Sequence, residues 1–406
     1  MRILQIDIAC NAFSTGRIVE GIGEEVLLSG GDSYVAYGRY SQPSQSLSIR
    51  IGNDLDAIFH LVLTRLFDKH GLGSRRATKM FLNIVTMIKP DIIHLHDIHG
   101  YYLNYPVLFR FIKEHGIPVV WTHHSCWAFT GHCAHFDKIN CVKWKTLCQD
   151  CTLIRDYPAS YFIDNSKCNY LAKKSIFTSI DRIENVAVSK WMEALIRESF
   201  LKIFPVRTIY NGIDTKVFMP KKNEVKKTFQ IEDKFLILGV AAKWTKEKGL
   251  YDFFKLSKYL DKKEFAIMLL GLESAQIKEL PKGIIGIRKI DNVQKLAEYY
   301  SAADLFLNPT WQDTFPTTNL ESLACGTPVI TYDTGGSGEG ISKDTGFVTK
   351  KGDIQSIIDI IKNVKKTGKQ CYSEACRNRV ITLFRQEDRF KEYLSLYKEI
   401  LETKHN

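Results

Sequence analysis

The sequence predicts an α/β protein built from two Rossmann-like domains that face each other across a cleft. Its 406 residues are too many for one typical hydrophobic core, so two domains are expected. Short β-branched runs alternate with helical stretches throughout the chain, and this rhythm is typical of parallel sheets covered by helices on both faces. Hydrophobic residues make up 45% and charged residues 25%, so each half can bury a substantial core.

The candidate strands fall into two sets along the chain. The first set is predicted at residues 3–8, 33–37, 91–95, 118–122 and 185–188. The second set is predicted at residues 206–210, 235–240, 265–270, 304–307, 328–331 and 346–348. A tight-turn signal, Asn-Gly-Ile-Asp at 211–214, lies near the junction. We therefore assign residues 1–200 to an N-terminal domain, with a cysteine-rich insertion at about 126–168, and residues 201–385 to a C-terminal domain.

A final helix is predicted over residues 386–406. Its apolar residues Phe390, Tyr393, Leu394 and Tyr397 fit one helical stripe, which has to pack on something. We expect this helix to return to the N-terminal domain.

The N-terminal segment is interpreted as a buried strand and not as a signal peptide, because Asp7 interrupts its apolar run. No stretch approaches the roughly 18 uninterrupted apolar residues of a membrane span. A cytoplasmic protein is therefore expected. The net charge of +11 is modest, and part of it comes from a lysine cluster at residues 221–227. That cluster is either a solvated linker or a surface for anionic lipid, whereas no recognisable module supports nucleic acid as a partner.

The loops that follow strands are the candidate ligand sites, because open α/β sheets bind ligands beyond the carboxyl ends of their strands. Residues 11–17 follow the first strand and include Gly16, and small residues there let backbone amides approach an anion at a helix start. The segment is not a GxGxxG fingerprint, which weakens a nicotinamide or flavin interpretation. An ordinary strand–turn–helix explains this segment equally well.

Two lysines follow the predicted strand at 235–240. Lys243 would act at the strand end and Lys248 near the next helix, so the pair could meet a diphosphate from two directions. Taken alone, the segment also fits a lysine-rich surface turn.

Two acids eight positions apart, Asp313 and Glu321, stand near a short predicted helix that ends at Gly326. Asp313 lies in a loop, where a carboxylate gains little from the fold, so a functional role is favoured. Residues 318–321 also fit a capping box, in which Glu321 would only reach back to the helix start. The backbone around Phe315, Pro316, Thr317 and Thr318 is available for a phosphate or a sugar hydroxyl.

Histidines cluster beyond two strand ends of the first half. His124 follows the strand at 118–122, and three further histidines surround Asp97 within residues 91–100. Histidines in such places can position hydroxyls or exchange protons, although any one of them is more often structural. His124 is the candidate we favour.

Six of the ten cysteines fall between Cys126 and Cys168. Four have the spacing C-x7-C-x6-C-x2-C, namely Cys133, Cys141, Cys148 and Cys151. A CxxC hook with two further cysteines is a moderate signal for a structural tetrathiolate zinc site, and free thiols in a long loop are the alternative. Stable disulfides are not expected in a cytoplasmic protein.

Taken together, these segments resemble a glycosyltransferase family 4-type enzyme with the GT-B fold, almost end to end. The acid-x7-acid signature is met by Asp313 and Glu321. The resemblance is to a bacterial subgroup of the colanic-acid and capsule type. Its Ser-Thr-Gly-Arg start is met at 14–17, and its Trp-Thr-x-His-Asp-x-Trp-x-Phe-Thr-Gly-His-Cys stretch corresponds to 121–133. Further hallmarks are Asn-Gly-Ile-Asp at 211–214 and Ala-Cys-Gly-Thr-Pro-Val at 324–329.

The resemblance implies a role for each matching residue. Lys243 and Lys248 would hold the donor diphosphate, Asp313 the hydroxyls of the donor sugar, and Glu321 the ribose. His124 would lie near the transferred sugar. Four positions depart from the family pattern: Lys243 where arginine is commoner, Asp313 for glutamate, Ser125 for aspartate, and Pro316 for glycine, which removes one backbone donor.

The implied reaction is retaining transfer of a hexose-type sugar from a UDP- or GDP-linked donor to a saccharide acceptor, without a bound divalent metal. A front-face departure fits better than a two-carboxylate glycosidase pair, and closure of the domains would exclude water. If the acceptor is lipid-linked, the protein would be peripheral at the inner face of the plasma membrane. Two alternatives stay open: a degenerate binding or assembly protein with this fold, and a nucleotide-sugar epimerase or hydrolase.

Overall fold

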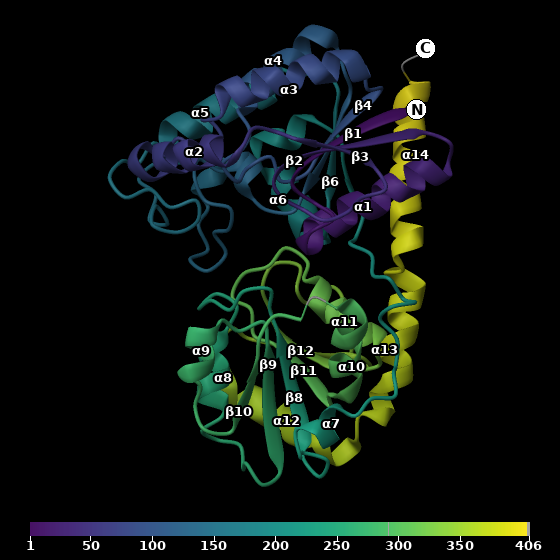
Figure 1. Cartoon of the computed structure of the whole chain (residues 1–406). Coiled ribbons are helices and arrows are strands. Elements are labelled where there is room, and N and C mark those ends of the chain that lie inside the picture. Colours follow the sequence, from purple (N-terminus) through teal and green to yellow (C-terminus); the bar gives the residue numbers. More distant parts are fainter. Residues whose placement is uncertain (291, 404–406) are drawn as a thin grey trace. The chain divides into compact units, whose positions relative to one another are not determined.

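The computed structural model describes residues 1–290 and 292–403, which divide into two compact units. The first unit comprises Met1–Tyr210 and the C-terminal segment from Glu387, and the second comprises Asn211–Gln386. Each unit is an open parallel sheet with helices on both faces (Figure 1), which confirms the predicted class of two Rossmann-like domains.

The first sheet has seven strands in the order β3-β2-β1-β4-β5-β6-β7. Its strands are β1 (Arg2–Cys10), β2 (Asp32–Ser41), β3 (Leu47–Arg50), β4 (Ile92–Leu95), β5 (Val119–His123), β6 (Ile183–Ala187) and β7 (Val206–Thr208). Its helices are α1 (Phe13–Leu28), α2 (Asp54–Phe67), α3 (Arg75–Ile88), α4 (Tyr105–His115), α5 (Ser166–Phe177), α6 (Lys190–Glu198) and α14 (Gln386–Glu402). Short 3-10 turns lie at Trp127–Phe129, Lys143–Lys145 and Phe200–Ile203.

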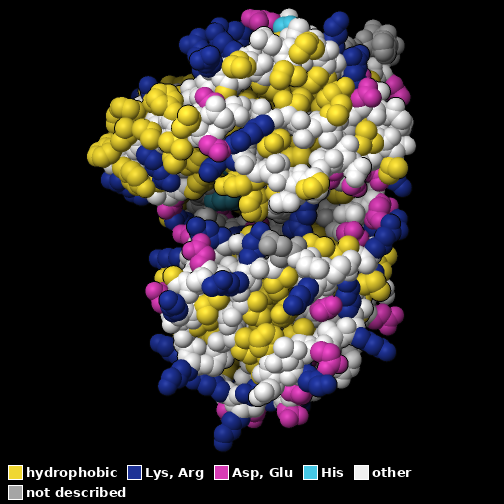
Figure 2. Space-filling model, viewed as in Figure 1, with side chains coloured by type: hydrophobic (Ala, Val, Ile, Leu, Met, Phe, Trp, Pro, Cys, Tyr) yellow, Lys and Arg dark blue, Asp and Glu magenta, His cyan; other side chains and the backbone are white. Residues whose placement is uncertain are grey.

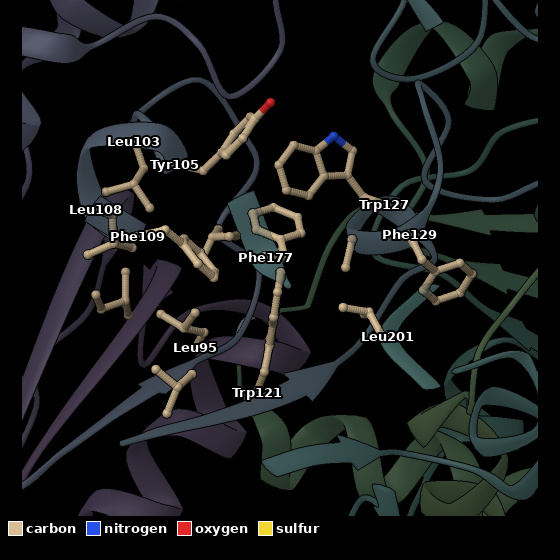
Figure 3. Packing of buried hydrophobic residues seen from close by; sticks show 14 of the residues in the cluster. Leu95, Leu103, Tyr105, Leu108, Phe109, Trp121, Trp127, Phe129, Phe177 and Leu201 are labelled. Atoms are coloured by element: carbon tan, nitrogen blue, oxygen red, sulfur yellow. The ribbon is translucent and has the colours of Figure 1, made fainter. Parts of the chain in front are cut away.

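Alternate residues of these strands enter two different cores. Leu4 and Ile6 of β1 join a cluster that includes Phe109 of α4 and Phe177 of α5, and Figure 3 shows several members of this cluster packed together. Ile3 joins the cluster on the other face, formed with α1 and α14. The strands are thus buried on both faces, which is why they appear in the sequence as continuous apolar runs.

The last helix packs in the first unit, as predicted. Phe390, Tyr393 and Tyr397 of α14 are buried in the cluster beneath β1, β4 and β5. The Tyr397 hydroxyl lies 2.6 Å from His94 Nδ1, and the Tyr393 hydroxyl lies 3.3 Å from Thr122 Oγ1. The aromatic stripe therefore carries hydrogen-bonding groups to the middle of the sheet.

The second sheet has six strands in the order β10-β9-β8-β11-β12-β13. Its strands are β8 (Phe235–Val240), β9 (Phe265–Leu270), β10 (Ile284–Ile287), β11 (Leu305–Asn308), β12 (Val329–Tyr332) and β13 (Gly346–Thr349). Its helices are α7 (Val225–Thr228), α8 (Leu250–Leu256), α9 (Ser274–Lys278), α10 (Val293–Ala302), α11 (Thr317–Ala324), α12 (Ile354–Thr367) and α13 (Gln370–Leu383). Leu305 and Leu307 of β11 face the core formed with α8 and α12, whereas Phe306 contacts Tyr300 of α10 on the other face.

Two aspects of the predicted strands need correction. Residues 206–210 were expected to open the second domain, but β7 pairs with β6 in the first sheet, with Ala187 opposite Thr208. The short edge strands β3 and β10 were not predicted. Their side chains are largely exposed or half-buried, so they lack the continuous apolar pattern that marks a central strand.

In both parallel sheets the order of the strands reverses at the first strand, because the fourth strand is added on its other side. In each unit the strand order places the first strand beside the fourth, β1 beside β4 and β8 beside β11. In open α/β sheets, ligands bind beyond the carboxyl ends of the strands at such switch points. The loops after these four strands are therefore the places to look for function.

Candidate functional site

The switch point of the second unit brings together two of the residues predicted from the sequence. Lys248 lies in the loop after β8, Asp313 lies in the loop after β11, and Lys248 Nζ donates a 2.6 Å hydrogen bond to Asp313 Oδ2. The Asp313 carboxylate is largely shielded from solvent, whereas the Lys248 side chain is about half-exposed. A cation and an acid thus meet where an anionic ligand would be expected.

These two loops are packed closely by their backbones. The Trp311 amide donates to the Glu247 carbonyl at 2.8 Å. Gly249, at φ 77°, has no room for a side chain, because a Cβ would lie 2.2 Å from the Pro309 carbonyl oxygen. Gly335, in the loop after β12, would likewise bring a Cβ within 1.7 Å of the Asp313 carbonyl. The backbone that carries Asp313 is therefore confined from two sides.

Lys243 does not join this pair. Its side chain is 73% exposed, and Nζ lies 3.6 Å from Glu273 Oε1. An exposed ion pair of this kind has a small free energy and leaves the side chain free to change rotamer. The two lysines predicted to meet one diphosphate are therefore not paired with each other here. Lys243 contacts Glu273, whereas Lys248 contacts Asp313.

Helix α11 begins directly after the Asp313 loop. Its N-cap residue is Pro316, no side chain caps it, and its first turn holds no acid. Phe315 and Pro316 are buried, so only their backbone can meet a ligand, while Thr317 and Thr318 are half-buried. The partial positive charge of the helix start is therefore available to an anion.

Glu321 is not a capping residue. Helix α11 begins at Thr317, so Glu321 lies in its fifth position, beyond the reach of a capping box, and that alternative is excluded. Its carboxylate is almost fully buried and accepts a 2.8 Å hydrogen bond from the Tyr300 hydroxyl. The bond fixes the orientation of the carboxylate.

In the first unit, His124 follows β5 and is held by a buried hydrogen-bonded chain. Gln5 Nε2 donates to the Val19 carbonyl, which leaves Gln5 Oε1 to accept from His96 Nε2 at 3.2 Å. His96 Nδ1 is then the acceptor for His124 Nε2 at 3.1 Å. In this arrangement His124 Nε2 carries a proton, so the neutral ring is the Nε2–H tautomer. Burial lowers the pKa of His124, which favours the same neutral form.

Two carboxylates at the switch point of the first unit were not among the predicted site residues. Asp7 Oδ1 accepts from the Asp97 amide at 3.1 Å. Burial and the charge of Asp97 raise the pKa of Asp7 to about 8. Burial also opposes ionisation of Asp97, but the charge of His99 and its hydrogen bond lower the pKa of Asp97 to about 2. The signal in the sequence was the histidine-rich segment around Asp97 and the polar Asp7 within an apolar run.

Ser125 occupies the position at which the family pattern has an aspartate. A different acid, Asp97, lies close to Ser125, and both contact His99. His99 Nε2 lies 3.1 Å from Ser125 Oγ and 3.2 Å from Asp97 Oδ1. The negative charge next to the histidine cluster thus comes from the loop after β4. Asp97 also raises the pKa of His124, in opposition to burial.

Gly16 lies inside α1 and not in the loop before it. A Cβ on Gly16 would stand 3.2 Å from both the Cβ and the carbonyl oxygen of Ala9 in β1. Close packing of the helix on the strand is therefore sufficient to explain this glycine. Its predicted contact with the donor stays a prediction.

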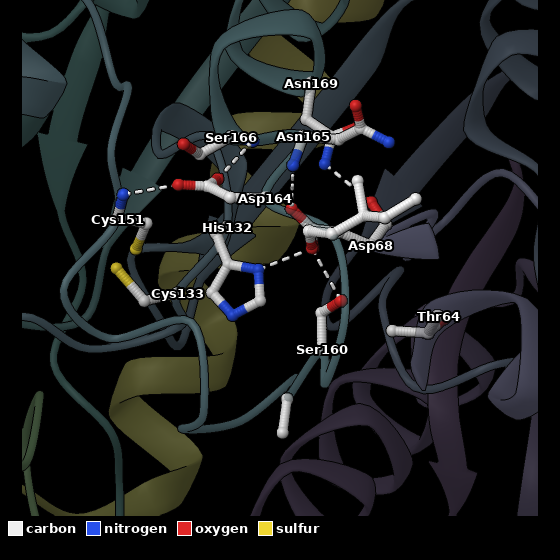
Figure 4. A network of polar contacts seen from close by, with 12 residues as sticks. Thr64, Asp68, His132, Cys133, Cys151, Ser160, Asp164, Asn165, Ser166 and Asn169 are labelled. Carbon is white, nitrogen blue, oxygen red and sulfur yellow. Dashed lines mark hydrogen bonds and ion pairs between the residues drawn. The ribbon is translucent and has the colours of Figure 1, made fainter. Parts of the chain in front are cut away.

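The four cysteines predicted to bind zinc gather in one region. Cys133 is buried, and Cys141, Cys148 and Cys151 pack partly buried against the same hydrophobic cluster. The Cys133 and Cys151 sulfurs face each other (Figure 4), and a hydrogen bond from Cys133 lowers the pKa of Cys151 to about 7. Within residues 1–290 and 292–403, no three His, Cys, Asp or Glu side chains are arranged to hold a metal ion. These side-chain positions therefore do not form the tetrathiolate site.

A buried ion pair joins this cysteine-rich segment to the end of α2. His132 Nδ1 lies 2.5 Å from Asp68 Oδ1, and neither side chain is exposed. Asp68 Oδ2 also accepts from the Asn165 amide at 3.0 Å, just before α5. The side-chain amide of Asn169 donates to the Asp68 carbonyl (Figure 4). Asp68 thus connects three segments that are distant in sequence.

The chain matches two protein-family models and several curated proteins. Residues 49–217 match the model described as Glycosyltransferase Family 4, and residues 233–366 match that of Glycosyl transferases group 1. WcaC of Escherichia coli K12, whose name places it among colanic acid biosynthesis glycosyl transferases, is 22% identical over 89% of this chain and 90% of its own. The capsular polysaccharide biosynthesis glycosyltransferase CapM of Staphylococcus aureus is 24% identical over 47% of this chain and 53% of its own.

Solved structures resemble the chain over nearly its whole length. Sucrose-phosphate synthase from Thermosynechococcus elongatus gives a TM-score of 0.75 at 17% identity, covering 99% of this chain and 100% of that protein. Anabaena HepE in complex with UDP and glucose gives a TM-score of 0.69 at 13% identity, covering 98% of this chain and 99% of HepE. At such identities the likeness shows the fold alone, and it confirms the predicted GT-B fold.

Proposed function

The chain belongs to the glycosyltransferases of the GT-B fold, and we propose that it transfers a hexose-type sugar from a nucleotide-diphosphate sugar to a saccharide acceptor in cell-surface polysaccharide biosynthesis. The relatives' names support the setting, since WcaC and CapM are named for colanic acid and capsular polysaccharide biosynthesis. The structural neighbour HepE was solved with UDP-glucose, which supports a nucleotide-diphosphate sugar as the donor.

The single observation that carries the proposal is the contact between Lys248 and Asp313 at the switch point of the second sheet. A diphosphate needs cations and helix N-termini, and both are found here in Lys248 and the start of α11. The hydroxyl groups of a donor sugar need a hydrogen-bond acceptor beside the phosphates, and the Asp313 carboxylate can serve as that acceptor. The buried, oriented Glu321 is then available for a ribose.

We propose retention of anomeric configuration by front-face departure, in which the donor phosphate takes the acceptor proton. Lys248, a reoriented Lys243 and the α11 N-terminus would balance the charge on the leaving diphosphate, and no divalent metal would be required. His124 would lie near the transferred sugar. Activity that is unchanged in EDTA is the expected result.

The first test is thermal stability of the purified protein against a panel of UDP-, GDP-, ADP- and CMP-linked sugars. A donor at 100 times its dissociation constant should add about 2.7 kcal/mol to the free energy of unfolding. The shift should be selective for one nucleotide and should be clearly smaller in both Glu321→Ala and Lys248→Ala. No shift with any donor would favour a degenerate binding protein, and sugar conversion without an acceptor would favour an epimerase or hydrolase.

The acceptor is proposed to be lipid-linked, with the protein peripheral at a membrane face. Among the helices of the described chain, none combines the length and apolarity needed to cross a membrane. We propose that the protein meets this acceptor at the membrane surface.

We also propose that Cys133, Cys141, Cys148 and Cys151 take up a structural zinc ion. Their spacing contains a CxxC hook, and all four contact one hydrophobic cluster. Binding would draw Cys141 and Cys148 toward the facing pair of Cys133 and Cys151. Metal analysis of the purified protein should give one zinc per chain, and a clearly lower stoichiometry would overturn the zinc site.

A further inference from the structure

Helix α2 exposes its apolar side. Leu55, Ile58, Phe59, Val62 and Leu66 recur at the three- and four-residue spacing of one helix face, and all are exposed. Leu55 is 75% exposed and Phe59 is 62% exposed. The buried residues of α2 are instead polar, His60 and Thr64. This is the reverse of the pattern expected for a helix that packs its apolar stripe on the protein core.

The apolar surface continues onto a neighbouring loop. The Tyr161 amide donates to the Arg65 carbonyl at 2.8 Å, which places the loop beside the end of α2. Tyr161, Phe162 and Ile163 are all exposed, Phe162 by 78%. We use the name α2 face for the exposed apolar surface formed by Leu55, Ile58, Phe59, Val62, Leu66, Phe67 and residues 161–163. Figure 2 shows hydrophobic side chains gathered where α2 lies in Figure 1.

Cations are built into the α2 face. The Arg65 guanidinium lies 5.2 Å and that of Arg155 5.4 Å from the Tyr161 ring centroid. Lys69 Nζ lies 5.8 Å from the Phe67 ring centroid. The acids of α2 are engaged elsewhere, since Asp54 contacts Arg50 and Asp56 caps the helix. The face therefore combines large apolar side chains with positive charge at its C-terminal end.

The conformation of this region is held by buried contacts. Asp68, the C-cap of α2, binds His132 and the Asn165 amide. Arg65 also donates to the Ala159 carbonyl at 3.2 Å, just before the exposed loop. Helix and loop are thus tied together beneath the surface, and their apolar side chains are presented as one face.

We propose that the α2 face docks the protein onto a lipid bilayer that carries anionic lipid. Helices with an apolar face and neighbouring cations lie in the plane of a membrane interface. Their apolar side chains insert among the acyl chains, and their cations contact the headgroups. A second copy of this chain is the other candidate occupant, and the test below separates the two; the cations of the face match anionic headgroups in charge, which favours the bilayer. The purpose of docking rests on the proposed lipid-linked acceptor, but the binding itself does not.

The test is flotation of the purified protein with vesicles of phosphatidylcholine alone or mixed with phosphatidylglycerol. The wild-type protein should float with the mixed vesicles. Phe59→Asp and Phe162→Asp should each lower the bound fraction by at least about tenfold, since each removes a large inserted side chain and adds a negative charge. Tyr259→Asp is the matched control, because Tyr259 is an equally exposed aromatic residue of the second unit, at 67%. It should float like the wild type.

Arg155→Gln should weaken flotation with the mixed vesicles and leave the weaker binding to phosphatidylcholine unchanged. The thermal shift with the nucleotide-sugar panel, measured on the same variants, should not change, so failure of docking and failure of the proposed transfer reaction are distinguishable. Absence of wild-type flotation, or flotation unaffected by both aspartate substitutions, would overturn the proposal. A concentration-dependent dimer that Phe59→Asp abolishes would overturn it in favour of self-association.

Discussion

Lys248 and Asp313 are joined by a 2.6 Å hydrogen bond, although one lies after β8 and the other after β11. Each residue is positioned by its own strand end, and the strand order brings the two ends together. The ammonium group therefore has a carboxylate partner before any diphosphate arrives. Donor binding would have to share or displace this contact, so the two residues should respond differently to substitution.

Lys248→Ala is expected to weaken binding of the free nucleoside diphosphate and of its sugar conjugate alike. A charge-assisted hydrogen bond contributes about 1.5–3 kcal/mol, so each dissociation constant should rise by about 10–100-fold. Asp313→Asn should weaken only the sugar conjugate, because it leaves Lys248 for the phosphates. Calorimetry with both ligands measures the difference. Equal losses for the two ligands in Asp313→Asn would contradict a sugar-binding role.

Lys243→Ala tests how far the second lysine of the pair contributes to donor binding. Lys243 is exposed and 3.6 Å from Glu273, so its loss should cost less donor affinity than the loss of Lys248. If the two alanine variants lose equal affinity, Lys243 reorients on binding and the pair acts as the sequence predicted.

The fold could be predicted where burial determines the residue pattern. Strands such as β8 and β9 are covered on both faces, and their bounds, Phe235–Val240 and Phe265–Leu270, agree with the prediction. The edge strand β3 could not be predicted, since its residues lie at the surface. The sheet to which residues 206–208 belong could not be predicted either, because the short strand Val-Arg-Thr does not indicate which strand it pairs with.

The site could be predicted in part for a similar reason. Residue types at strand ends singled out Lys248, Asp313 and His124 as candidates, but hydrogen-bond partners depend on three-dimensional contacts. Tyr300 stands 21 residues before Glu321, yet its hydroxyl orients the Glu321 carboxylate. The sequence had offered a local capping box as the alternative role of this carboxylate. Gln5 lies 91 residues from His96, and no local pattern indicates that it fixes the histidine chain.

His124→Ala is expected to lower kcat by about 10²–10⁴-fold, if the His124 ring exchanges a proton or holds a hydroxyl in the transition state. The donor-induced thermal shift should stay close to that of the wild type, because His124 belongs to the first unit. The pKa of His124 is lowered from 6.5, so the neutral ring persists below that pH. The acidic limb of the pH–rate profile should therefore lie below pH 6.5, and a limb above it would contradict this role.

Asp68→Asn is expected to destabilise the first unit strongly. Removing one partner of a buried ion pair typically costs about 3–5 kcal/mol, and here the change also leaves His132 without its carboxylate. Urea unfolding followed by tryptophan fluorescence measures the loss, since Trp121, Trp127 and Trp144 are buried in this unit. Asp54→Asn is the control, because Asp54 pairs with Arg50 at the surface and its loss should cost less than about 1 kcal/mol. Similar losses for the two variants would show that the Asp68 network adds little.

Acid should destabilise the first unit through its buried histidines, and His60 shows why. Its Nε2 accepts from the Gly71 and Gly73 amides, and Nδ1 lies 3.0 Å from Ser74 Oγ, so the ring is held neutral. Burial lowers the pKa of His60 from 6.5 to about 3 and that of His123 to about 4. Below pH 6.5 the unfolded chain therefore binds protons that the folded chain does not. Above pH 6.5 these two rings should make no pH-dependent contribution to the free energy of unfolding. Below pH 6.5 the free energy of unfolding should fall as the pH drops toward 3–4, by up to about 1.4 kcal/mol per pH unit for each ring.

The contribution of His60 can be isolated by comparing His60→Gln with the wild type in urea titrations across this pH range. A glutamine carbonyl can accept the Gly71 and Gly73 amides but cannot titrate, so the variant should lose stability less steeply on acidification, by up to about 1.4 kcal/mol per pH unit. His115→Gln is the control for the loss of an exposed histidine, since His115 is exposed at the end of α4. A His60→Gln slope equal to that of the wild type would mean that His60 takes up its proton in the folded chain as readily as in the unfolded one.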